Sequence, residues 1–192
     1  MRPCAARRLL CAALAALAFP ASGIALASDA GSGAPISVRV SAQEGLEEVA
    51  GSFFVAAPRE TAFAVLTDYG HMASFVTSLR RSQVRGHRGD GVVLEQEATA
   101  RMLLFSKTMK VLLDVREEPG RALRFRDVSH ADFESYEGSW TLEDAPGGTR
   151  VRYALCARPR EAVPQFLLGP AMEKAAAELL AQVRDEIERR AR

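Results

Sequence analysis

The adjacent residues Asp68 and Tyr69 are the strongest candidates for acid–base chemistry in this sequence. A carboxylate beside a phenol can exchange protons with a substrate if burial raises the pKa of the aspartate. A structural role competes with this interpretation, because an aspartate between two helices can cap the second helix through a side-chain oxygen. We favour capping, so the sequence predicts no catalytic residue, with Asp68 and Tyr69 as the alternative.

Sequence motifs for other kinds of catalysis are missing. The sequence contains no phosphate-binding glycine loop, nucleophile elbow or dinucleotide fingerprint. The three histidines, His71, His87 and His130, lack the close spacing of a zinc-ligand pair. We therefore expect neither a metal site nor a cofactor, and hydrolase or nucleotide-dependent activities have no support from the sequence.

The composition is that of an ordinary globular protein with one domain. Of the 192 residues, 48% are hydrophobic and 26% are charged, with 25 basic and 24 acidic side chains. The first 27 residues hold three of the arginines and no acid, which leaves 22 basic and 24 acidic groups, a net charge of −2, in the remainder. Electrostatic capture of nucleic acid is therefore disfavoured.

The beginning of the chain has the pattern of a secretory signal peptide. Three arginines in the first eight residues precede an apolar run of eleven residues from Leu9 to Phe19, and small residues follow up to Ala27. The run is well short of the ~20 residues that a membrane-spanning helix needs. The sequence thus predicts a signal peptide over residues 1–27, cleavage near Ala27, and export to the periplasm or the exterior.

The order of elements after this segment is strand, two short helices, six strands and one long helix. Residues 28–45 read as a flexible leader with a first extended segment, and helical patterns follow over residues 58–70 and 71–76. From 79 to 158, apolar and polar residues alternate between turn signals about a dozen residues apart, which is typical of antiparallel strands. The last 28 residues repeat apolar side chains every three or four positions. A curved sheet around one helix predicts a cavity between them.

Several short motifs follow one another along residues 46–189. They are Asp68-Tyr69, Phe75-Val76, Gly138, Trp140, Gly148-Thr149 and Tyr153. Their order and spacing resemble those of the SRPBCC or START-like superfamily of polyketide cyclases, dehydrases and lipid transporters, in particular its coenzyme-Q-binding branch. This resemblance implies an α+β helix-grip fold: a seven-stranded antiparallel sheet wrapped around a long C-terminal helix, with two short helices after the first strand and a hydrophobic tunnel. On this basis residues 46–192 form the START-like domain.

The predicted ligand contacts follow from the alternation along the strands and the apolar face of the last helix. Polar side chains on the inward face must find hydrogen-bond partners, so they are candidates for binding a carbonyl or hydroxyl head group. These are Gln96, Asp127, Tyr136 and Tyr153. The predicted contacts to the apolar body of the ligand are Phe75, Leu94, Met102, Leu104, Leu113, Phe125, Trp140, Met172 and Leu179. A register error of one residue would turn the strand residues outward.

The leading hypothesis from the sequence is an exported, non-enzymatic carrier of a hydrophobic small molecule, either a lipid or an isoprenoid-quinone-like compound. Transient contact with a membrane would accompany that role, and nucleic acid is not an expected partner. The first alternative is a cyclase or aromatase that uses Asp68, Tyr69, Tyr136 or Tyr153 to position a substrate. The second alternative is a protein-interaction module that uses the outer face of the sheet.

Overall fold

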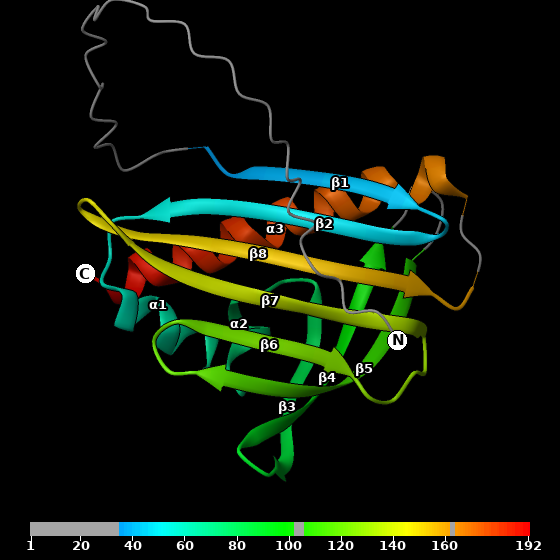
Figure 1. Cartoon of the computed structure of the whole chain (residues 1–192), viewed down its shortest axis with the longest axis horizontal. Helices are drawn as coiled ribbons and strands as arrows, with labels where there is room; N and C mark the ends of the chain where they lie inside the picture. The colour runs from blue at the N-terminus through cyan, green and yellow to red at the C-terminus, as the bar shows by residue number, and fades with distance from the viewer. Residues whose placement is uncertain (1–34, 102–105, 162–163) are drawn as a thin grey trace, which may run out of the picture.

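A computed structural model describes residues 35–101, 106–161 and 164–192 (Figure 1). In this part of the chain, eight strands form one antiparallel sheet in the order β1-β2-β8-β7-β6-β5-β4-β3. The elements are β1 (Ser37–Gln43), β2 (Leu46–Val55), α1 (Arg59–Leu66), α2 (Met72–Phe75), β3 (Leu79–Arg88), β4 (Gly91–Arg101), β5 (Ser106–Glu118), β6 (Ala122–Asp127), β7 (Phe133–Ala145), β8 (Gly148–Pro159) and α3 (Gln165–Arg190).

The α+β helix-grip fold, the six strands between residues 79 and 158 and the long terminal helix are confirmed. Two details of the prediction are wrong, since the described sheet has eight strands instead of seven and the short helices follow β2 instead of the first strand. The extra strand is β1, which pairs with β2 from Ser37↔Ser52 to Gln43↔Leu46. Glu44 and Gly45 connect the two strands with φ of 52° and 77°, the backbone that a two-residue hairpin turn requires.

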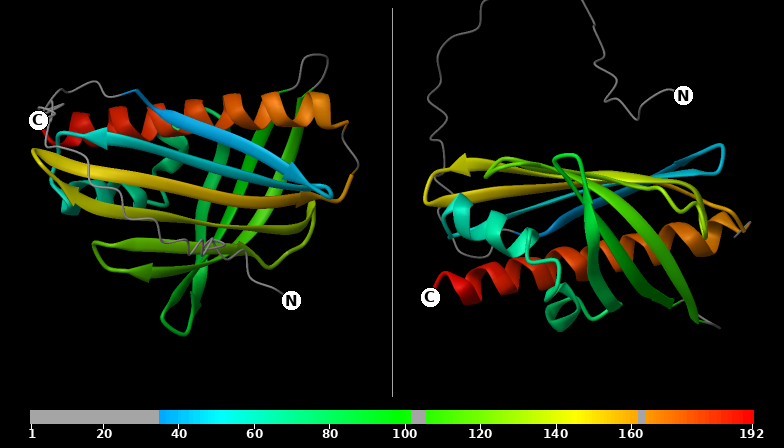
Figure 2. Two further views of the ribbon diagram at one scale, coloured as in Figure 1. Left: turned by 45° about the horizontal axis from the view of Figure 1, so that its top comes forward. Right: turned by 90° about the horizontal axis from the view of Figure 1, so that it is seen from below.

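The sheet is strongly curved, and its two halves are covered by different helices. Figure 2 shows β3, β4 and β5 turned steeply against β6, β7 and β8. Helix α3 packs on β1, β2 and α1, and it meets β4 only marginally. The segment that contains α2 covers part of the other half, where Tyr69 and Met72 pack with Leu94, Leu113 and Val115. Among the described residues, no helix combines the length and the apolar character needed to cross a membrane.

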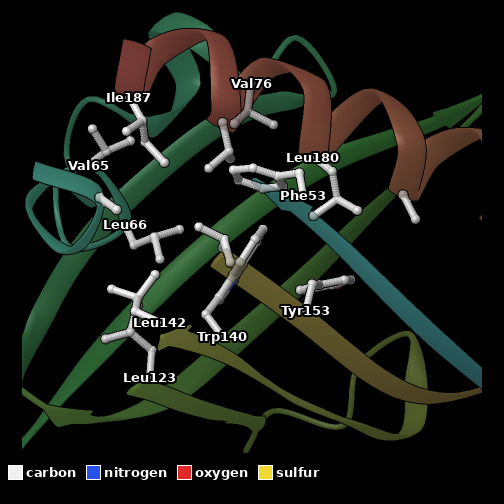
Figure 3. Packing of buried hydrophobic residues seen from close by; sticks show 14 of the residues in the cluster. Phe53, Val65, Leu66, Val76, Leu123, Trp140, Leu142, Tyr153, Leu180 and Ile187 are labelled. Carbon is white, nitrogen blue, oxygen red and sulfur yellow. The ribbon is translucent and has the colours of Figure 1, made fainter. Parts of the chain in front are cut away.

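The main core lies between α1, the second half of α3 and the sheet (Figure 3). Val65 of α1 and Leu180, Val183 and Ile187 of α3 are fully buried there. The helix approaches β2 closely because Gly51 has no side chain. A Cβ atom at Gly51 would lie 2.5 Å from Cδ1 of Leu180, closer than side-chain atoms pack.

Candidate ligand-binding site

The inner face of the sheet carries its side chains in rows that run across neighbouring strands. The register pairs Leu123 with Trp140 and Trp140 with Tyr153, so these three residues form one row over β6, β7 and β8. Figure 3 shows Trp140 and Tyr153 pointing from the sheet into the space below α3. Tyr136 lies in a second row, opposite the small Ala157 of β8. The alternation in the sequence therefore predicts the inner face of these strands correctly.

Aromatic rings dominate the middle of this inner face. The ring centroids of Trp140 and Tyr153 lie 4.6 Å apart, and those of Phe133 and Tyr136 lie 4.8 Å apart. Such tilted pairs are favourable contacts beyond simple burial. Each of the two tyrosine rings is thus held by an aromatic neighbour on its own part of the sheet.

Gly138 makes room for a third aromatic ring. The Phe125 ring of the neighbouring strand lies over Gly138, so that a Cβ atom there would be 2.5 Å from Cζ of Phe125. The centroid of Phe125 is 6.0 Å from that of Tyr136. The glycine in this predicted family motif therefore positions an aromatic side chain beside the Tyr136 phenol.

The phenols of Tyr136 and Tyr153 lie close enough to affect each other's pKa. Burial raises the pKa of Tyr136 to about 12, although the Tyr153 phenol lowers it and the charge of Asp127 raises it further. Burial also raises the pKa of Tyr153 well above its ordinary value. Both groups therefore stay neutral near pH 7 and can act as hydrogen-bond donors or acceptors.

Two basic side chains engage Asp68, which argues against the catalytic alternative considered from the sequence. Its carboxylate lies 2.6 Å from Nδ1 of His71 and accepts a 2.7 Å hydrogen bond from Nη2 of Arg190. The bonds from His71 and then Arg190 lower the pKa of Asp68, the opposite of what proton transfer near pH 7 requires. Helix α2 has no side-chain hydrogen bond at its N-terminus, so the predicted cap is also absent in this described segment.

The Asp68 carboxylate belongs to an ionic cluster that ties the α1–α2 junction to the C-terminal end of α3. Arg190 also donates to Glu186 at 2.7 Å, and Arg189 donates two hydrogen bonds to the same carboxylate at 2.7 Å. Together these bonds lower the pKa of Glu186 to about 2, with Arg189 as the largest cause. The cluster, which we call the ionic clamp, consists of Asp68, His71, Glu186, Arg189 and Arg190.

Tyr69 is buried and donates a 2.7 Å hydrogen bond to Oε1 of Glu117 on β5. Burial is the largest cause that raises the pKa of Tyr69 far above its ordinary value, and the bond to Glu117 adds to it. The phenol proton is therefore held by a neighbouring carboxylate. This contact joins the α1–α2 segment to the sheet.

Two of the predicted polar contacts already have structural partners. Asp127 accepts four hydrogen bonds, from three backbone N–H groups and one hydroxyl, at 2.7–3.0 Å. Three of these bonds shape the β6–β7 connection and the fourth comes from the Leu112 N–H of β5, so we remove Asp127 from the proposed ligand contacts. Gln96 donates to Oγ of Ser82 at 3.2 Å and meets Sδ of Met72 at 3.5 Å, which links β4 to β3 and α2.

The residues predicted to contact the apolar body of the ligand fall into a buried group and a partly buried group. Leu94 and Leu113 are buried under the α2 segment, and Trp140 is buried in the main core. Phe75, Phe125, Met172 and Leu179 pack against the core but remain only partly buried. Met102 and Leu104 lie outside the described residues. The structure thus brings part of the predicted set together, while contact of any of these residues with a ligand stays a prediction.

Three further residues join the partly buried set. Met109 and Val111 of β5 alternate with the exposed Thr108 and Lys110, and this alternation was a sequence signal for them. Leu79 is the first residue of β3, shortly after α2, so the alternation of apolar and polar residues does not show which way its side chain faces. We call the whole set the partly exposed inner surface. Its members are Phe75, Leu79, Met109, Val111, Phe125, Tyr136, Met172 and Leu179.

Two hollows of the described structure lie away from this surface. One, of about 450 Å³, is on the outer side of β1, β2, β7 and β8, and the other, of about 360 Å³, is beside the start of α1. Neither of these two hollows corresponds to the cavity predicted between the sheet and the helix, so that cavity stays a prediction. In the same described ranges, no three side chains of the usual metal-ligating types gather into a metal site.

The antiparallel sheet gripping a C-terminal helix and the aromatic inner face define a helix-grip domain of the START-like superfamily. The chain belongs to the family described as polyketide cyclase/dehydrase and lipid transport, whose model matches residues 47–192. Comparison with curated protein sequences gives no match.

Solved structures with the same fold come from several bacteria. A STAR-related lipid transfer protein from Xanthomonas axonopodis is 18% identical, with a TM-score of 0.66 over 82% of this chain and 96% of that one. The Zhui aromatase/cyclase from Streptomyces sp. R1128 is 18% identical, with a TM-score of 0.64 over 77% and 96%. A START superfamily protein from Mycobacterium smegmatis is 18% identical, with a TM-score of 0.59 over 75% and 96%. These similarities show the fold alone.

Proposed function

We propose that this protein is a carrier that binds a hydrophobic small molecule on the partly exposed inner surface. The observation that supports this proposal is that eight apolar or aromatic residues face the inside of the fold without being fully covered. Apolar surface left in contact with water costs roughly 25 cal/mol per Å², and a ligand that covers it recovers that free energy. Apolar surface that is left partly exposed is a common feature of binding sites.

The packing of α3 supports entry of the ligand at its N-terminal half. Met172 lies on this half, Leu179 lies just beyond it, and α3 as a whole barely meets β4. The opposite half is fixed by the close contact between Leu180 and Gly51 and by the ionic clamp. Separation of the helix from the sheet therefore takes place most easily on the side of Met109 and Val111.

A cyclase or aromatase remains the second candidate function, supported by the buried Tyr136–Tyr153 pair. Phenols whose pKa is raised by burial are poor bases near pH 7, but they can hold a substrate carbonyl in place. The sequence alternative based on Asp68 has no such support, because that carboxylate is engaged in the ionic clamp. For these reasons we favour a carrier over an enzyme.

The proposal extends to location, ligand class and membrane contact. The signal-peptide pattern of residues 1–27 supports export to the periplasm or the exterior, and the family resemblance supports a lipid or isoprenoid-quinone-like ligand. Residues 164–172 at the start of α3 carry no charged side chain, and Phe166 is 76% exposed. An exposed aromatic residue at an uncharged helix end suits brief contact with lipid, where such a ligand resides.

Native mass spectrometry tests the carrier proposal directly. The full chain is expressed with its N-terminal segment in a bacterial host, purified gently from the exported fraction, and extracted with organic solvent. We expect cleavage near Ala27 and about one bound hydrophobic molecule per chain. A protein that carries nothing and takes up no compound from a screen of lipids and quinones would contradict the proposal.

A further inference from the structure

The sheet has two edge strands, β1 and β3, and they differ in how well they are protected from further pairing. Every second residue of an edge strand directs its N–H and C=O groups away from the sheet, where another strand can pair with them. Strand β3 carries four arginines, and its register with β4 shifts at two places. Bulges and charges of this kind prevent edge-to-edge association in many sheet proteins.

Strand β1 has neither form of protection. It pairs with β2 at seven consecutive positions without a register shift, and it contains a single charged residue, Arg39, and no proline. In Figure 1, β1 borders the sheet on the side opposite to β3. Within the described ranges, no segment pairs with its outer edge. The β1 edge is therefore the part of the sheet that can accept a further strand.

The two faces of β1 have different chemistry. Val38 and Val40 lie on the inner face, where they pack against the main core but stay only partly buried. Ser37, Arg39 and Ser41 alternate with them on the outer face and are exposed. A strand that pairs with β1 must therefore offer small apolar side chains on one face and an acceptor for a positive charge on the other.

A second copy of β1 meets the first requirement when the two strands run antiparallel about a two-fold axis at Val40. In this register all seven residues of the strand are paired. Val40 faces Val40 of the second copy, and Val38 faces Ala42, so small apolar side chains meet on the inner face. The partly buried edge of the core is thereby covered in both copies.

The outer face of the same register brings opposite charges together. Arg39 faces Ser41 of the second copy, and Glu48 of that copy comes next in the row because it pairs with Ser41. Glu48 is exposed and lies two strand spacings, about 10 Å, from Arg39, a distance that the two side chains can span together. The axis repeats this contact, and no like charges stand directly opposite each other.

We propose that the chain forms a symmetric dimer in which the β1 strands of two copies pair antiparallel and join the two sheets into one. The partner is a second copy because β1 is complementary to itself in length, in apolar contacts and in charge. Pairing also satisfies the free backbone groups of both edges at once. The dimer does not depend on the carrier function, since β1 contributes no residue to the partly exposed inner surface.

Sedimentation velocity tests whether the dimer forms, with protein purified without detergent after expression of the full chain. We expect a dimer at about 100 µM chain that dissociates below about 1 µM, as suits a small interface. A monomer at every concentration would overturn the proposal.

The variant Val40→Cys measures the register, because the axis places the two new thiols opposite each other. Opposite residues of antiparallel strands have Cα atoms about 5 Å apart, which a disulfide can bridge. Mild oxidation should give a crosslinked dimer on a non-reducing gel, above the background of the native cysteines. Ala42→Cys is the matched control, since Ala42 faces Val38 of the second copy and should crosslink far less. Crosslinking of both variants to the same extent, or of neither, would overturn the proposed pairing.

Charge exchange tests the outer face independently. Arg39→Glu places a negative charge near Glu48 of the second copy, and Ser41→Arg places a positive charge opposite Arg39. Each should raise the dissociation constant about tenfold, because the axis repeats the unfavourable contact. Both substitutions together bring opposite charges face to face and should restore the native value. Thr108→Arg adds a charge to the outer face of β5, away from the edge, and should leave the dimer unchanged. Single variants that dimerise like the native protein, or a double variant that fails to recover, would overturn the proposal.

Discussion

The two halves of α3 meet the sheet in different ways. The C-terminal half buries Leu180, Val183 and Ile187 completely and is tied to the α1–α2 junction by the ionic clamp. The N-terminal half leaves Met172 only partly buried and exposes Phe166. One helix therefore combines a region that stabilises the fold with a region that is free to accommodate a ligand, and a substitution should act on stability in one half and on binding in the other.

The largest difference between buried and partly buried positions of α3 should appear in two adjacent leucines. Leu180→Ala removes a fully buried side chain that contacts β2, and we expect it to lower the free energy of unfolding by about 3 kcal/mol. Leu179→Ala removes a partly buried side chain and should cost about 1 kcal/mol. Urea denaturation of both variants measures the difference. Equal losses of stability would show that the two positions do not differ in packing.

The ionic clamp should make stability depend on pH below about 4.5. The pKa of Glu186 is about 2 in the folded protein, against an ordinary value of 4.5. A lowered pKa adds stability above the unfolded value, and that stability is lost as the pH falls from about 4.5 towards 2. Glu186→Gln should therefore lower stability by about 2 kcal/mol at pH 7 and much less at pH 2.5. Thermal unfolding at both pH values measures this, and a loss of the same size at both would contradict the assignment.

A charge on the partly exposed inner surface should impair binding more than it impairs folding. Met109→Asp places a carboxylate among apolar residues that the ligand covers, and we expect at least about a tenfold loss in affinity for the hydrophobic dye N-phenyl-1-naphthylamine. Thr108→Asp puts the same charge on the exposed, opposite face of β5 and serves as the matched control. Loss of dye binding in both variants, or in neither, would show that the ligand does not bind on the partly exposed inner surface.

The smallest expected effect is at the exposed end of α3. Phe166→Ser should reduce association with phosphatidylcholine vesicles by about threefold and change the free energy of unfolding by less than about 0.5 kcal/mol. Vesicle flotation measures the association, and Val84→Ser is a control at a second exposed apolar residue, on the edge strand β3. The membrane contact would be refuted if both variants floated like the native protein.

The strands, the last helix and the inner face of the sheet could be predicted from the sequence, because their apolar residues repeat with the period of each element. The register places Trp140 and Tyr153 on that face as alternation predicts. Strand β1 was missed as part of the sheet because a short alternating segment does not reveal its pairing partner. Met109 and Val111 carried the same alternating signal as Leu113 and were overlooked.

The roles of individual polar residues depend on partners that are distant in the chain or on local backbone geometry. Asp68 is engaged by Arg190, 122 residues later, and no local pattern shows this pairing. Asp127 satisfies backbone groups of a connection whose shape becomes known only with the fold. Similarly, the order of the layers does not reveal how closely Gly51 lets α3 approach β2. Burial patterns are thus readable from sequence, whereas hydrogen-bond partners and close approaches of the backbone are not.

The methionine methyl groups offer the most direct test of where a hydrophobic ligand binds. Met109 and Met172 belong to the partly exposed inner surface, whereas Met72 of α2 is buried against β4 and β5. In a protein labelled with ¹³C at the methionine methyls, titration with 2-dodecanone should shift the signals of Met109 and Met172, saturate near one equivalent and leave Met72 almost unchanged. A shift confined to Met72, or no shift at any of the three while the ketone binds, would contradict a ligand site beneath the N-terminal half of α3.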